Sequence, residues 1–368
     1  MKAHVHTPVT EPSLPPHETG DGDAPRQENI RARSPFLAAR LKDYLALSKP
    51  RVTSLVMMSF AAGMVLGGWA VPSGSSLSLW LIALAGSWLV IAAANALNQV
   101  FEREFDAKMR RTAGRPLPSG RLGPSEGLAV AVVWAVLGLT LLALFVNLLT
   151  AALGAASILI YAFAYTPLKR RTHMCTVVGA IPGAIPPLAG WAAARNEIGL
   201  AAVLLFAIQF IWQFPHFWAI AWLYRDDLQA AGFRMLPFPA APFNAGQERS
   251  TASQRGCGPS DRLDYPAGLS SAANGGNRPA DVASRADGNA TGLLALQYSL
   301  ALLPLTAAFG ILVSSPALYV LGALLLGGWM VRAAGRFWRA PTDVNARRLL
   351  KTSVIYLPLL LLLAVATW

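Results

Sequence analysis

Three polar side chains spaced by four residues, Asn98, Glu102 and Asp106, follow the almost wholly apolar stretch Leu77–Ala94. In a helix, this spacing places all three side chains on one face. Carboxylates at the end of a membrane helix are costly unless they bind something cationic. Mg²⁺ commonly binds one or two carboxylates together with the phosphate oxygens of a substrate. The pattern therefore predicts a magnesium site that holds a diphosphate, in an intramembrane enzyme acting on a prenyl diphosphate.

Positive side chains follow this motif and are suited to binding the diphosphate. Arg115 lies beside Pro116 in a turn-rich stretch, and Lys169 and Arg170 end a later apolar stretch. Arginine suits this task because its guanidinium group makes bidentate contacts with phosphate oxygens. We therefore predict that Arg115, Lys169 and Arg170 contact the diphosphate. The alternative, equally compatible with composition for Lys169 and Arg170, is that these cations only mark the cytoplasmic side of the membrane.

A second acidic group, Asp226 and Asp227, follows another apolar stretch. One of these carboxylates is a candidate ligand for a second Mg²⁺, because two metal ions can flank a diphosphate and neutralise it as it leaves. The alternative is an ordinary charge pair with Arg225. The predicted metal ligands are therefore Asn98, Glu102, Asp106, Asp226 and Asp227, and of these Asn98, Glu102, Asp106 and Asp227 are also the predicted catalytic residues.

Two histidines are candidate ligands for haem iron, which imidazole can bind. His216 is an ionisable residue inside an apolar span, beside Pro215, and such residues default to a functional role. His173 lies in the loop after Arg171. The alternative for both is a histidine that is only packed and hydrogen-bonded.

The composition is that of a polytopic membrane protein. Hydrophobic residues make up 54% of the chain and charged residues only 14%, whereas a soluble domain carries about 25% charged residues. Nine apolar stretches are long enough, or nearly so, to span a bilayer core about 30 Å thick. They are Val52–Val71, Leu77–Val100, Gly127–Phe145, Leu148–Tyr165, Thr176–Ala194, Gly199–Leu223, Gly292–Val313, Pro316–Val331 and Leu350–Trp368. We therefore predict an all-α protein with a bundle of nine transmembrane helices.

The distribution of charge predicts how this bundle lies in the membrane. The net charge is +12, and all but one of the 31 Lys and Arg residues fall in the N-terminal tail or in the loops after spans two, four, six and eight. The exception is Arg195. By the positive-inside rule, the N-terminus is cytoplasmic and the C-terminus lies outside. The basic balance is thus explained by the lipid bilayer, and no nucleic-acid partner is expected.

Composition divides the chain into four parts. Residues 1–44 are expected to form a cytoplasmic tail, disordered at first and then an interfacial helix, and 45–238 hold spans one to six. Residues 239–291 are a low-complexity cytoplasmic insertion, and 292–368 hold spans seven to nine. Five acidic residues in the tail argue against a mitochondrial transit peptide. A bacterial inner membrane is therefore expected, with the mitochondrial inner membrane as the alternative.

Span five is unusually rich in proline and glycine, with Pro182, Pro186 and Pro187 inside an apolar stretch. Such a sequence is tolerated in a membrane helix only if neighbouring groups satisfy the carbonyls that the prolines leave without a donor. Its small residues also allow close helix packing. We expect a kinked helix that lines the cavity.

Several segments resemble the UbiA-type intramembrane prenyltransferases and, within them, the protohaem IX farnesyltransferases, also called haem O synthases. The resemblance covers roughly Leu45 to Trp368 without the insertion. The matching segments are Leu47–Arg51, Asn95–Arg121, Tyr165–Arg171, Gly179–Trp191, Pro215–Trp218 and Tyr224–Pro237. The proline-rich span five, Pro215–Trp218 and Tyr224–Pro237 are specific to the haem branch, whereas the acidic motif alone indicates only the superfamily.

The resemblance implies a helical bundle whose central cavity opens to the cytoplasmic side and laterally to lipid. It implies Mg²⁺-dependent transfer of a farnesyl group from farnesyl diphosphate to a vinyl group of haem B, giving haem O and diphosphate. It also implies a haem A synthase or an oxidase assembly factor as a partner. By position, Asn98, Glu102 and Asp106 match the first metal-diphosphate motif and Asp227 matches the second. Lys169 and Arg170 match the basic end of span four.

This sequence departs from the superfamily pattern in two motifs and in the insertion. Glu102 stands where many members have Asp, and Leu223 takes the place of the first carboxylate of the second motif. Three alternative functions stay open. They are a prenyltransferase with an aromatic or chlorin acceptor, a secondary transporter, which also uses broken helices and midplane charges, and a haem-handling protein without catalysis.

Overall fold

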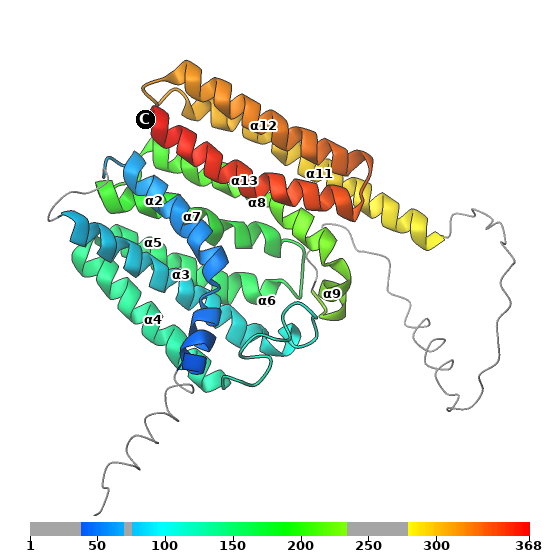
Figure 1. The fold of residues 1–368 in the computed structure, drawn as a ribbon, viewed down its shortest axis with the longest axis horizontal. Helices are drawn as coiled ribbons and strands as arrows, with labels where there is room; N and C mark the ends of the chain where they lie inside the picture. Colours follow the sequence, from blue (N-terminus) through cyan, green and yellow to red (C-terminus); the bar gives the residue numbers. More distant parts are fainter. Residues whose placement is uncertain (1–37, 70–75, 234–278) are drawn as a thin grey trace, which may run out of the picture. The chain divides into compact units, whose positions relative to one another are not determined.

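The computed structural model describes residues 38–69, 76–233 and 279–368, and these residues form helices and turns without any strand (Figure 1). The chain divides into the units Met1–Asp43 and Tyr44–Trp368. The described part of the first unit is helical, and all elements named below belong to the second. Residues 1–37 of the predicted tail (1–44) and residues 239–278 of the predicted insertion (239–291) lie outside the described residues, whereas 279–291 belong to the helix that starts at Pro279.

Eight helical segments are long and apolar enough to cross a membrane among the described residues. They are α3 (Ser76–Asp106), α4 (Pro124–Phe145), the segment Leu148–Leu168, α7 (Cys175–Arg195), α8 (Leu200–Leu223), α11 (Pro279–Phe309), α12 (Pro316–Arg339) and α13 (Asp343–Thr367). The all-α class predicted from the sequence is confirmed. The remaining apolar helix, α2 (Pro50–Leu66), has only 17 residues, so the count of nine spans stays a prediction.

Local sequence explains where several of these helices begin. α2, α4 and α12 start with Pro50, Pro124 and Pro316, because proline lacks the N–H group that the first helical turn leaves unpaired. α13 begins after Thr342, whose hydroxyl accepts a hydrogen bond from the backbone N–H of Asn345. α11 begins at Pro279, upstream of residue 292, where span seven was expected to start.

The outward faces of the long helices carry large apolar side chains. Leu144 of α4, Leu325 of α12 and Leu362 of α13 are 72%, 68% and 60% exposed. An apolar surface this continuous would make a water-soluble protein aggregate, whereas it matches the hydrocarbon of a bilayer. The helices and their outward faces together indicate a multi-pass membrane protein.

The proline-rich helix α7 is the most buried of the candidate spans among the described residues. It packs against α2, α8 and α5 (Leu148–Leu159). Two glycines make the contact with α2 close. A Cβ atom at Gly63 would collide with the carbonyl oxygen of Pro187, and one at Gly190 would collide with that of Phe60. The predicted close packing of small residues is therefore present in this helix pair.

Glutamine side chains from α8 complete the hydrogen bonding of α7. Pro187 has no N–H group to donate to the carbonyl of Gly183, four residues earlier. Instead, Gln209 Nε2 donates to Gly183 O at 2.7 Å, and Gln213 Nε2 donates to Ala180 O at 3.0 Å. Both glutamines are buried. The requirement that neighbours satisfy the freed carbonyls of this helix is met at Gly183 by an amide from the adjacent helix.

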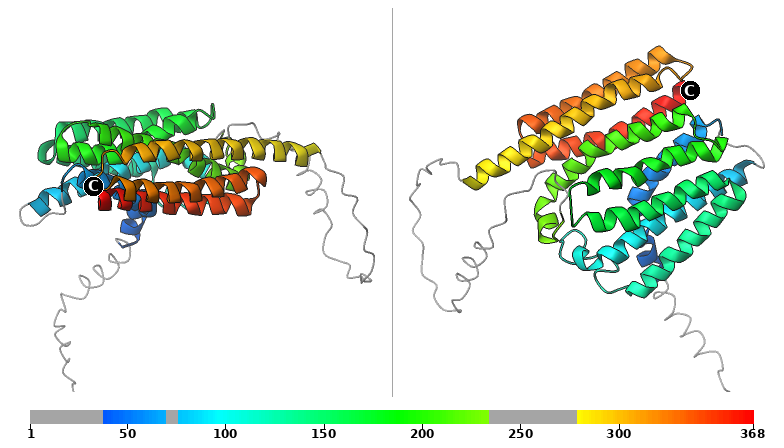
Figure 2. Two further views of the ribbon diagram at one scale, coloured as in Figure 1. Left: turned by 90° about the horizontal axis from the view of Figure 1, so that it is seen from above. Right: turned by 180° about the vertical axis from the view of Figure 1, so that it is seen from behind.

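A π-helical turn and a group of three helices also contribute to the site. Between α5 and α6 (Thr166–Leu168), the chain makes a π-helical turn, η1 (Ile160–Tyr165), a feature common at functional sites. Figure 2 shows α11, α12 and α13, coloured yellow to red, packed together as one group. α13 also packs against α8 and α2. These contacts bring residues from α2, α8 and α13 around the same cavity.

Candidate active site

The three polar side chains of the acidic motif lie on one buried face of α3. This helix continues to Asp106, past the predicted end of span two at Val100, so the whole motif is helical. Asn98, Glu102 and Asp106 are only 2%, 5% and 2% exposed. Charged groups buried this deeply require partners of opposite charge or a bound ion.

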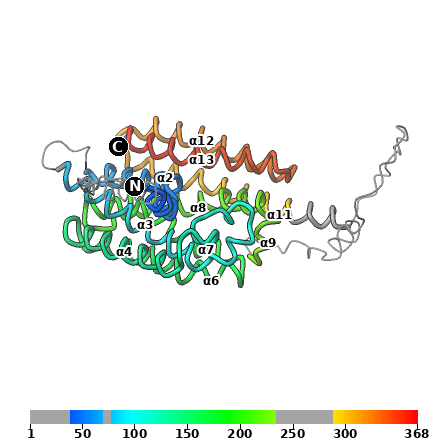
Figure 3. Tube along the Cα trace, turned by 60° about the horizontal axis from the view of Figure 1, so that its bottom comes forward, coloured from blue at the N-terminus to red at the C-terminus, as the bar shows by residue number. Residues whose placement is uncertain are grey.

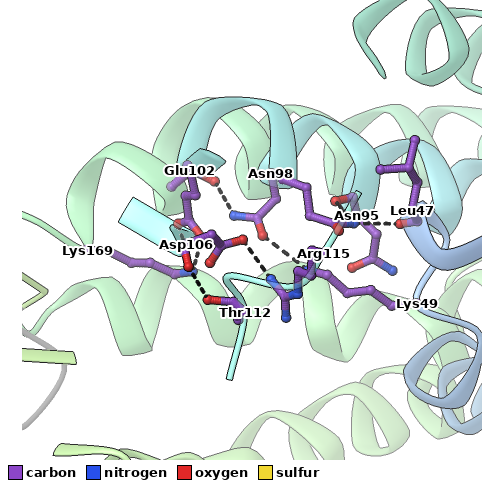
Figure 4. Close-up of polar contacts among 11 residues, drawn as sticks. Leu47, Lys49, Asn95, Asn98, Glu102, Asp106, Thr112, Arg115 and Lys169 are labelled. Carbon is purple, nitrogen blue, oxygen red and sulfur yellow. Dashed lines mark hydrogen bonds and ion pairs between the residues drawn. The ribbon is translucent and has the colours of Figure 1, made fainter. Parts of the chain in front are cut away.

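Each of these three side chains contacts a cation from a different segment of the chain (Figure 4). Lys49, just before α2, donates from Nζ to Asn98 Oδ1 at 3.2 Å. Lys169 Nζ, after α6, lies 2.8 Å from Glu102 Oε1 and donates a hydrogen bond to Oε2 at 3.1 Å. Arg115 Nη1 lies 2.8 Å from Asp106 Oδ2. The geometry thus places Arg115 and Lys169 beside the acidic motif and adds Lys49. The contact of Arg115 and Lys169 with a diphosphate stays a prediction.

Hydroxyl groups fix the ends of this arrangement. Asn98 Nδ2 donates to Thr166 Oγ1 at 3.1 Å, which leaves Oδ1 as the acceptor that faces Lys49. Thr112 Oγ1 donates to the carbonyl of Asp106 at 2.7 Å and thereby folds the following loop back onto the end of α3 (Figure 4). The loop that carries Arg115 is therefore anchored at the carboxylate that Arg115 contacts.

The site holds more positive than negative side chains. Lys49, Lys169 and Arg115 face the two carboxylates of Glu102 and Asp106. Burial, followed by the charges of Arg115 and Lys169, lowers the pKa of Lys49 to about 7. Burial also disfavours the charge on Lys169, but the carboxylate of Glu102 outweighs it and raises the pKa of Lys169 above its ordinary value. An anionic guest would neutralise this excess of positive charge.

The donor chemistry of the α3 residues fits Mg²⁺. Two carboxylates and one amide oxygen are hard oxygen ligands, and Mg²⁺ characteristically takes its remaining ligands from water and phosphate. Among the described residues, no three His, Cys, Asp or Glu side chains lie close enough together to hold one metal ion by themselves. Phosphate oxygens and water would have to complete the coordination, as they do for Mg²⁺ in other phosphate-transfer sites.

The second acidic group lies on a short helix beside the end of α3. Asp226 and Asp227 are in the first turn of α9 (Arg225–Ala230), where Asp226 is exposed and Asp227 half-buried. Phe105, near the end of α3, packs against Phe233, which follows α9, and their ring centroids are 5.8 Å apart. This contact holds α9 beside the end of α3. The end of α3, α6 and α9 all lie at one end of the bundle (Figures 1 and 3). The second metal site stays a prediction.

Lys169 and Arg170 are consecutive but point to different places. Lys169 is buried against Glu102, whereas Arg170 is exposed and its guanidinium carbon lies 4.5 Å from the centre of the Phe105 ring. Successive residues of a helical turn are rotated by about 100°, so the two side chains leave the turn in different directions. The predicted contact of Arg170 with the diphosphate stays a prediction.

A largely apolar cavity of about 410 Å³ begins next to the acidic site. Asn95, one turn before Asn98, lines it, as does Tyr165, whose ring lies 4.4 Å from Lys169 Nζ. Gly179 of α7 makes room for Tyr165, because a Cβ atom there would lie 2.6 Å from the ring. Side chains from α2, α3, η1, α7, α8 and α13 line the rest. Such a cavity suits an apolar chain attached to a polar head.

His216 lines this cavity, and its hydrogen bond defines the atom that it offers. Nδ1 lies 2.9 Å from Ser353 Oγ, which itself donates to Leu350 O at 2.8 Å. Because a hydroxyl has one hydrogen, Ser353 accepts from Nδ1, which leaves Nε2 with a free lone pair. His173, by contrast, is exposed in the loop before α7 and does not line the cavity.

Several site residues received no role from the sequence. Lys49 lies in the segment Leu47–Arg51 that resembles the family, but its type and position alone assign it no role, and the same is true of Thr166, Tyr165 and Ser353. Lys49 had a usable signal, since it is a cation directly before Pro50 and on the same predicted membrane side as the acidic motif. The other three had none, because hydroxyl groups in apolar spans are common.

Comparison with known proteins identifies the family. The profile of the UbiA prenyltransferase family matches residues 56–250. A protoheme IX farnesyltransferase from Solibacter usitatus is 40% identical over 329 residues, which are 87% of this chain and 96% of that relative.

Solved structures share the fold at low sequence identity. A structure of digeranylgeranylglyceryl phosphate synthase superposes with a TM-score of 0.61 at 15% identity and covers 89% of this chain and 98% of its own. A UbiA homologue from Archaeoglobus fulgidus bound to DMAPP and Mg²⁺ gives a TM-score of 0.52 at 13% identity, covering 85% and 98%. The chain therefore belongs to the UbiA prenyltransferase family, and the prenyltransferase class predicted from its sequence is confirmed.

Proposed function

We propose that this protein transfers a farnesyl group from farnesyl diphosphate to a vinyl group of haem B, giving haem O and diphosphate. The observation that carries the proposal is the buried cluster of Glu102 and Asp106 with three facing cations, placed at the mouth of an apolar cavity. The cluster suits a diphosphate head, and the cavity suits a prenyl tail. The acceptor follows from the 40% identical relative, which is a protoheme IX farnesyltransferase.

Asn98, Glu102 and Asp106 would hold Mg²⁺, whose charge would stabilise the oxygens of the diphosphate. Lys169 and Arg115 already lie beside the two carboxylates and can turn toward phosphate oxygens. Their charges stabilise the diphosphate most as it leaves, which favours departure with the bonding electrons. Asp227 belongs to the same proposal as a ligand of a second ion, together with Asp226.

The cavity would protect the reactive allylic cation that remains. Its lining is apolar apart from a few groups such as Asn95, Gln209 and His216, so little water is present to quench the cation. The C1–O bond of farnesyl diphosphate breaks, and C1 forms a bond with the terminal carbon of the haem vinyl group. Water then adds to the other vinyl carbon and a proton leaves, which gives the hydroxyethylfarnesyl arm of haem O.

His216 is the candidate ligand for the haem iron. Its Nε2 atom carries the free lone pair because Ser353 accepts the hydrogen of Nδ1. We expect His216→Leu to abolish the shift in haem B absorbance that accompanies iron ligation. Ser353→Ala should weaken haem binding and Ser353→Thr should preserve it, since only threonine keeps the hydroxyl.

The proposed location is a bacterial inner membrane, with the N-terminus and the acidic site on the cytoplasmic side and the C-terminus outside. It rests on the positive-inside distribution of Lys and Arg. There the cavity would open to the cytoplasmic side, and haem O would pass to a haem A synthase or an oxidase assembly factor. A reporter enzyme that is active only on the non-cytoplasmic side of the membrane is fused after Trp368 to test the orientation. An inactive fusion would contradict the proposed external C-terminus.

Haem analysis tests the function directly. The full chain, or the Asp106→Asn variant, is expressed in a host that lacks its own haem O synthase, and membrane haems are identified by mass spectrometry. We expect haem O from the unmodified chain and none from the variant. Absence of haem O despite well-expressed, folded protein would refute the haem acceptor. Assays with aromatic acids would then test the aromatic-acceptor alternative.

A further inference from the structure

A second cavity, of about 540 Å³, lies outside the acidic site at the same end of the bundle. Its lining comes from the loop after α3, the turn after α6 and the end of α9. Lys108, Arg170 and Arg171 supply its charged groups, and Gln229 and Phe105 also line it. Among the described residues that line it, none is acidic.

Within residues 38–69, 76–233 and 279–368, the three cations of this cavity have no carboxylate partner. No ion pair within the described residues involves Lys108, Arg170 or Arg171. The neighbouring Glu104 pairs with Arg103 at 2.8 Å instead. The acids of the candidate active site are likewise occupied by Lys169 and Arg115. Positive charge therefore accumulates here without a compensating ion pair from the part of the chain that the structure describes.

Two of these cations contact the same aromatic ring. Lys108 Nζ lies 5.6 Å and the Arg170 guanidinium carbon 4.5 Å from the centre of the Phe105 ring. The Phe105 ring in turn packs against Phe233. Like charges held near one ring repel each other, and an anion bound in the cavity that both cations line would reduce that repulsion.

The chemistry of these groups matches a diphosphate or another phosphate-type anion. Arg170 and Arg171 each offer a guanidinium fork, and Lys108 offers an ammonium group. An acidic lining would suit a metal ion, and an apolar lining would suit a lipid tail. The described lining of this cavity combines the three cations with Phe105 and small side chains and includes no acid, and the side-chain amide of Gln229 adds another hydrogen-bond donor.

We propose that Lys108, Arg170 and Arg171 form a second anion site, which binds diphosphate without Mg²⁺. Because Arg170 directly follows Lys169, the site adjoins the metal site without sharing its carboxylates. Within the proposed function, on which this part rests, the site receives the diphosphate product as it leaves Lys169 and Arg115. Its anion chemistry is equally that of a phospholipid headgroup, and the experiment separates these two sources.

The test measures binding of inorganic diphosphate to the purified full-length protein in uncharged detergent with EDTA, by isothermal titration calorimetry. Lys108→Gln/Arg171→Gln removes two of the three charges and leaves Arg170 in place. Arg110→Gln is the matched control, since Arg110 is an exposed cation of the same loop that does not line the cavity. Lys108→Arg/Arg171→Lys keeps both charges. Size-exclusion profiles verify that all variants are folded.

We expect the Lys108→Gln/Arg171→Gln variant to bind diphosphate about tenfold more weakly, while Arg110→Gln and the charge-conserving variant bind as the parent does. Equal affinity in the parent and the Lys108→Gln/Arg171→Gln variant overturns the proposal, as does an equal loss in Arg110→Gln. The measurement requires neither haem nor a prenyl donor. It therefore stands apart from the haem analysis, which can fail while diphosphate still binds here.

Nanodiscs identify the source of the anion. Diphosphate binding is compared in phosphatidylcholine nanodiscs and in nanodiscs that also contain phosphatidylglycerol. If phosphatidylglycerol weakens binding in the parent but not in the Lys108→Gln/Arg171→Gln variant, the site exists and a lipid headgroup competes for it. If binding is unchanged in the parent, the site exists and accepts the soluble anion.

Discussion

Removing Lys169 alone should destabilise the protein strongly, whereas removing it together with Glu102 should not. Lys169 and Glu102 are 9% and 5% exposed, and Nζ lies 2.8 Å from Glu102 Oε1. In Lys169→Met, the carboxylate of Glu102 stays buried without its cation. In Glu102→Met/Lys169→Met, two flexible apolar side chains fill similar volumes beside Tyr165 and Phe233, whose rings already contact Lys169.

The expected magnitude follows from this geometry. At 2.8 Å and an effective dielectric constant of 20, the Coulomb attraction between the two charges is about 6 kcal/mol. Desolvation of both groups offsets most of that gain, so the pair adds little net stability. Loss of one partner forfeits the attraction and keeps the desolvation cost of the other. We therefore expect the free energy of unfolding to fall by about 3–5 kcal/mol in Lys169→Met.

The assay is reversible unfolding in mixed detergent micelles with increasing dodecyl sulfate, followed by circular dichroism. The double variant should lie within about 1 kcal/mol of the parent, because replacing a buried ion pair by apolar groups is often neutral. Both variants should fail to form haem O. If the double variant is as unstable as Lys169→Met, the pair contributes to stability in its own right, which would refute the expectation that desolvation offsets most of its attraction.

Two further predictions concern α7. Gly190→Ala should lower the free energy of unfolding by about 1–3 kcal/mol, because its Cβ would collide with α2. The control Gly328→Ala, with open space around it, should be neutral or slightly stabilising. Equal effects of the two substitutions would contradict the close contact between α7 and α2. Gln209→Leu should cost about 1–3 kcal/mol by leaving Gly183 O without a donor. The double variant Gln209→Leu/Pro187→Ala should recover part of that loss, because alanine restores an N–H group at residue 187. Additive losses in the same unfolding assay would show that the two groups do not serve the same carbonyl.

The sequence by itself determined the class of the protein and the core of its site. Apolar stretches of bilayer length can bury their backbone polar groups only as helices, so the all-α membrane fold followed from length and composition. The four-residue spacing placed Asn98, Glu102 and Asp106 on one face, because helix periodicity is a local property. The segments that resemble the family added the prenyltransferase class.

Only the tertiary structure decided which groups meet these side chains. Lys49 reaches Asn98 across 49 positions of sequence and Lys169 reaches Glu102 across 67, and such contacts depend on how helices pack, which no local pattern encodes. The amide from Gln209 that replaces the missing donor of Pro187 likewise depends on the register between α7 and α8. Local periodicity thus fixed what each helix presents, and packing fixed what it faces.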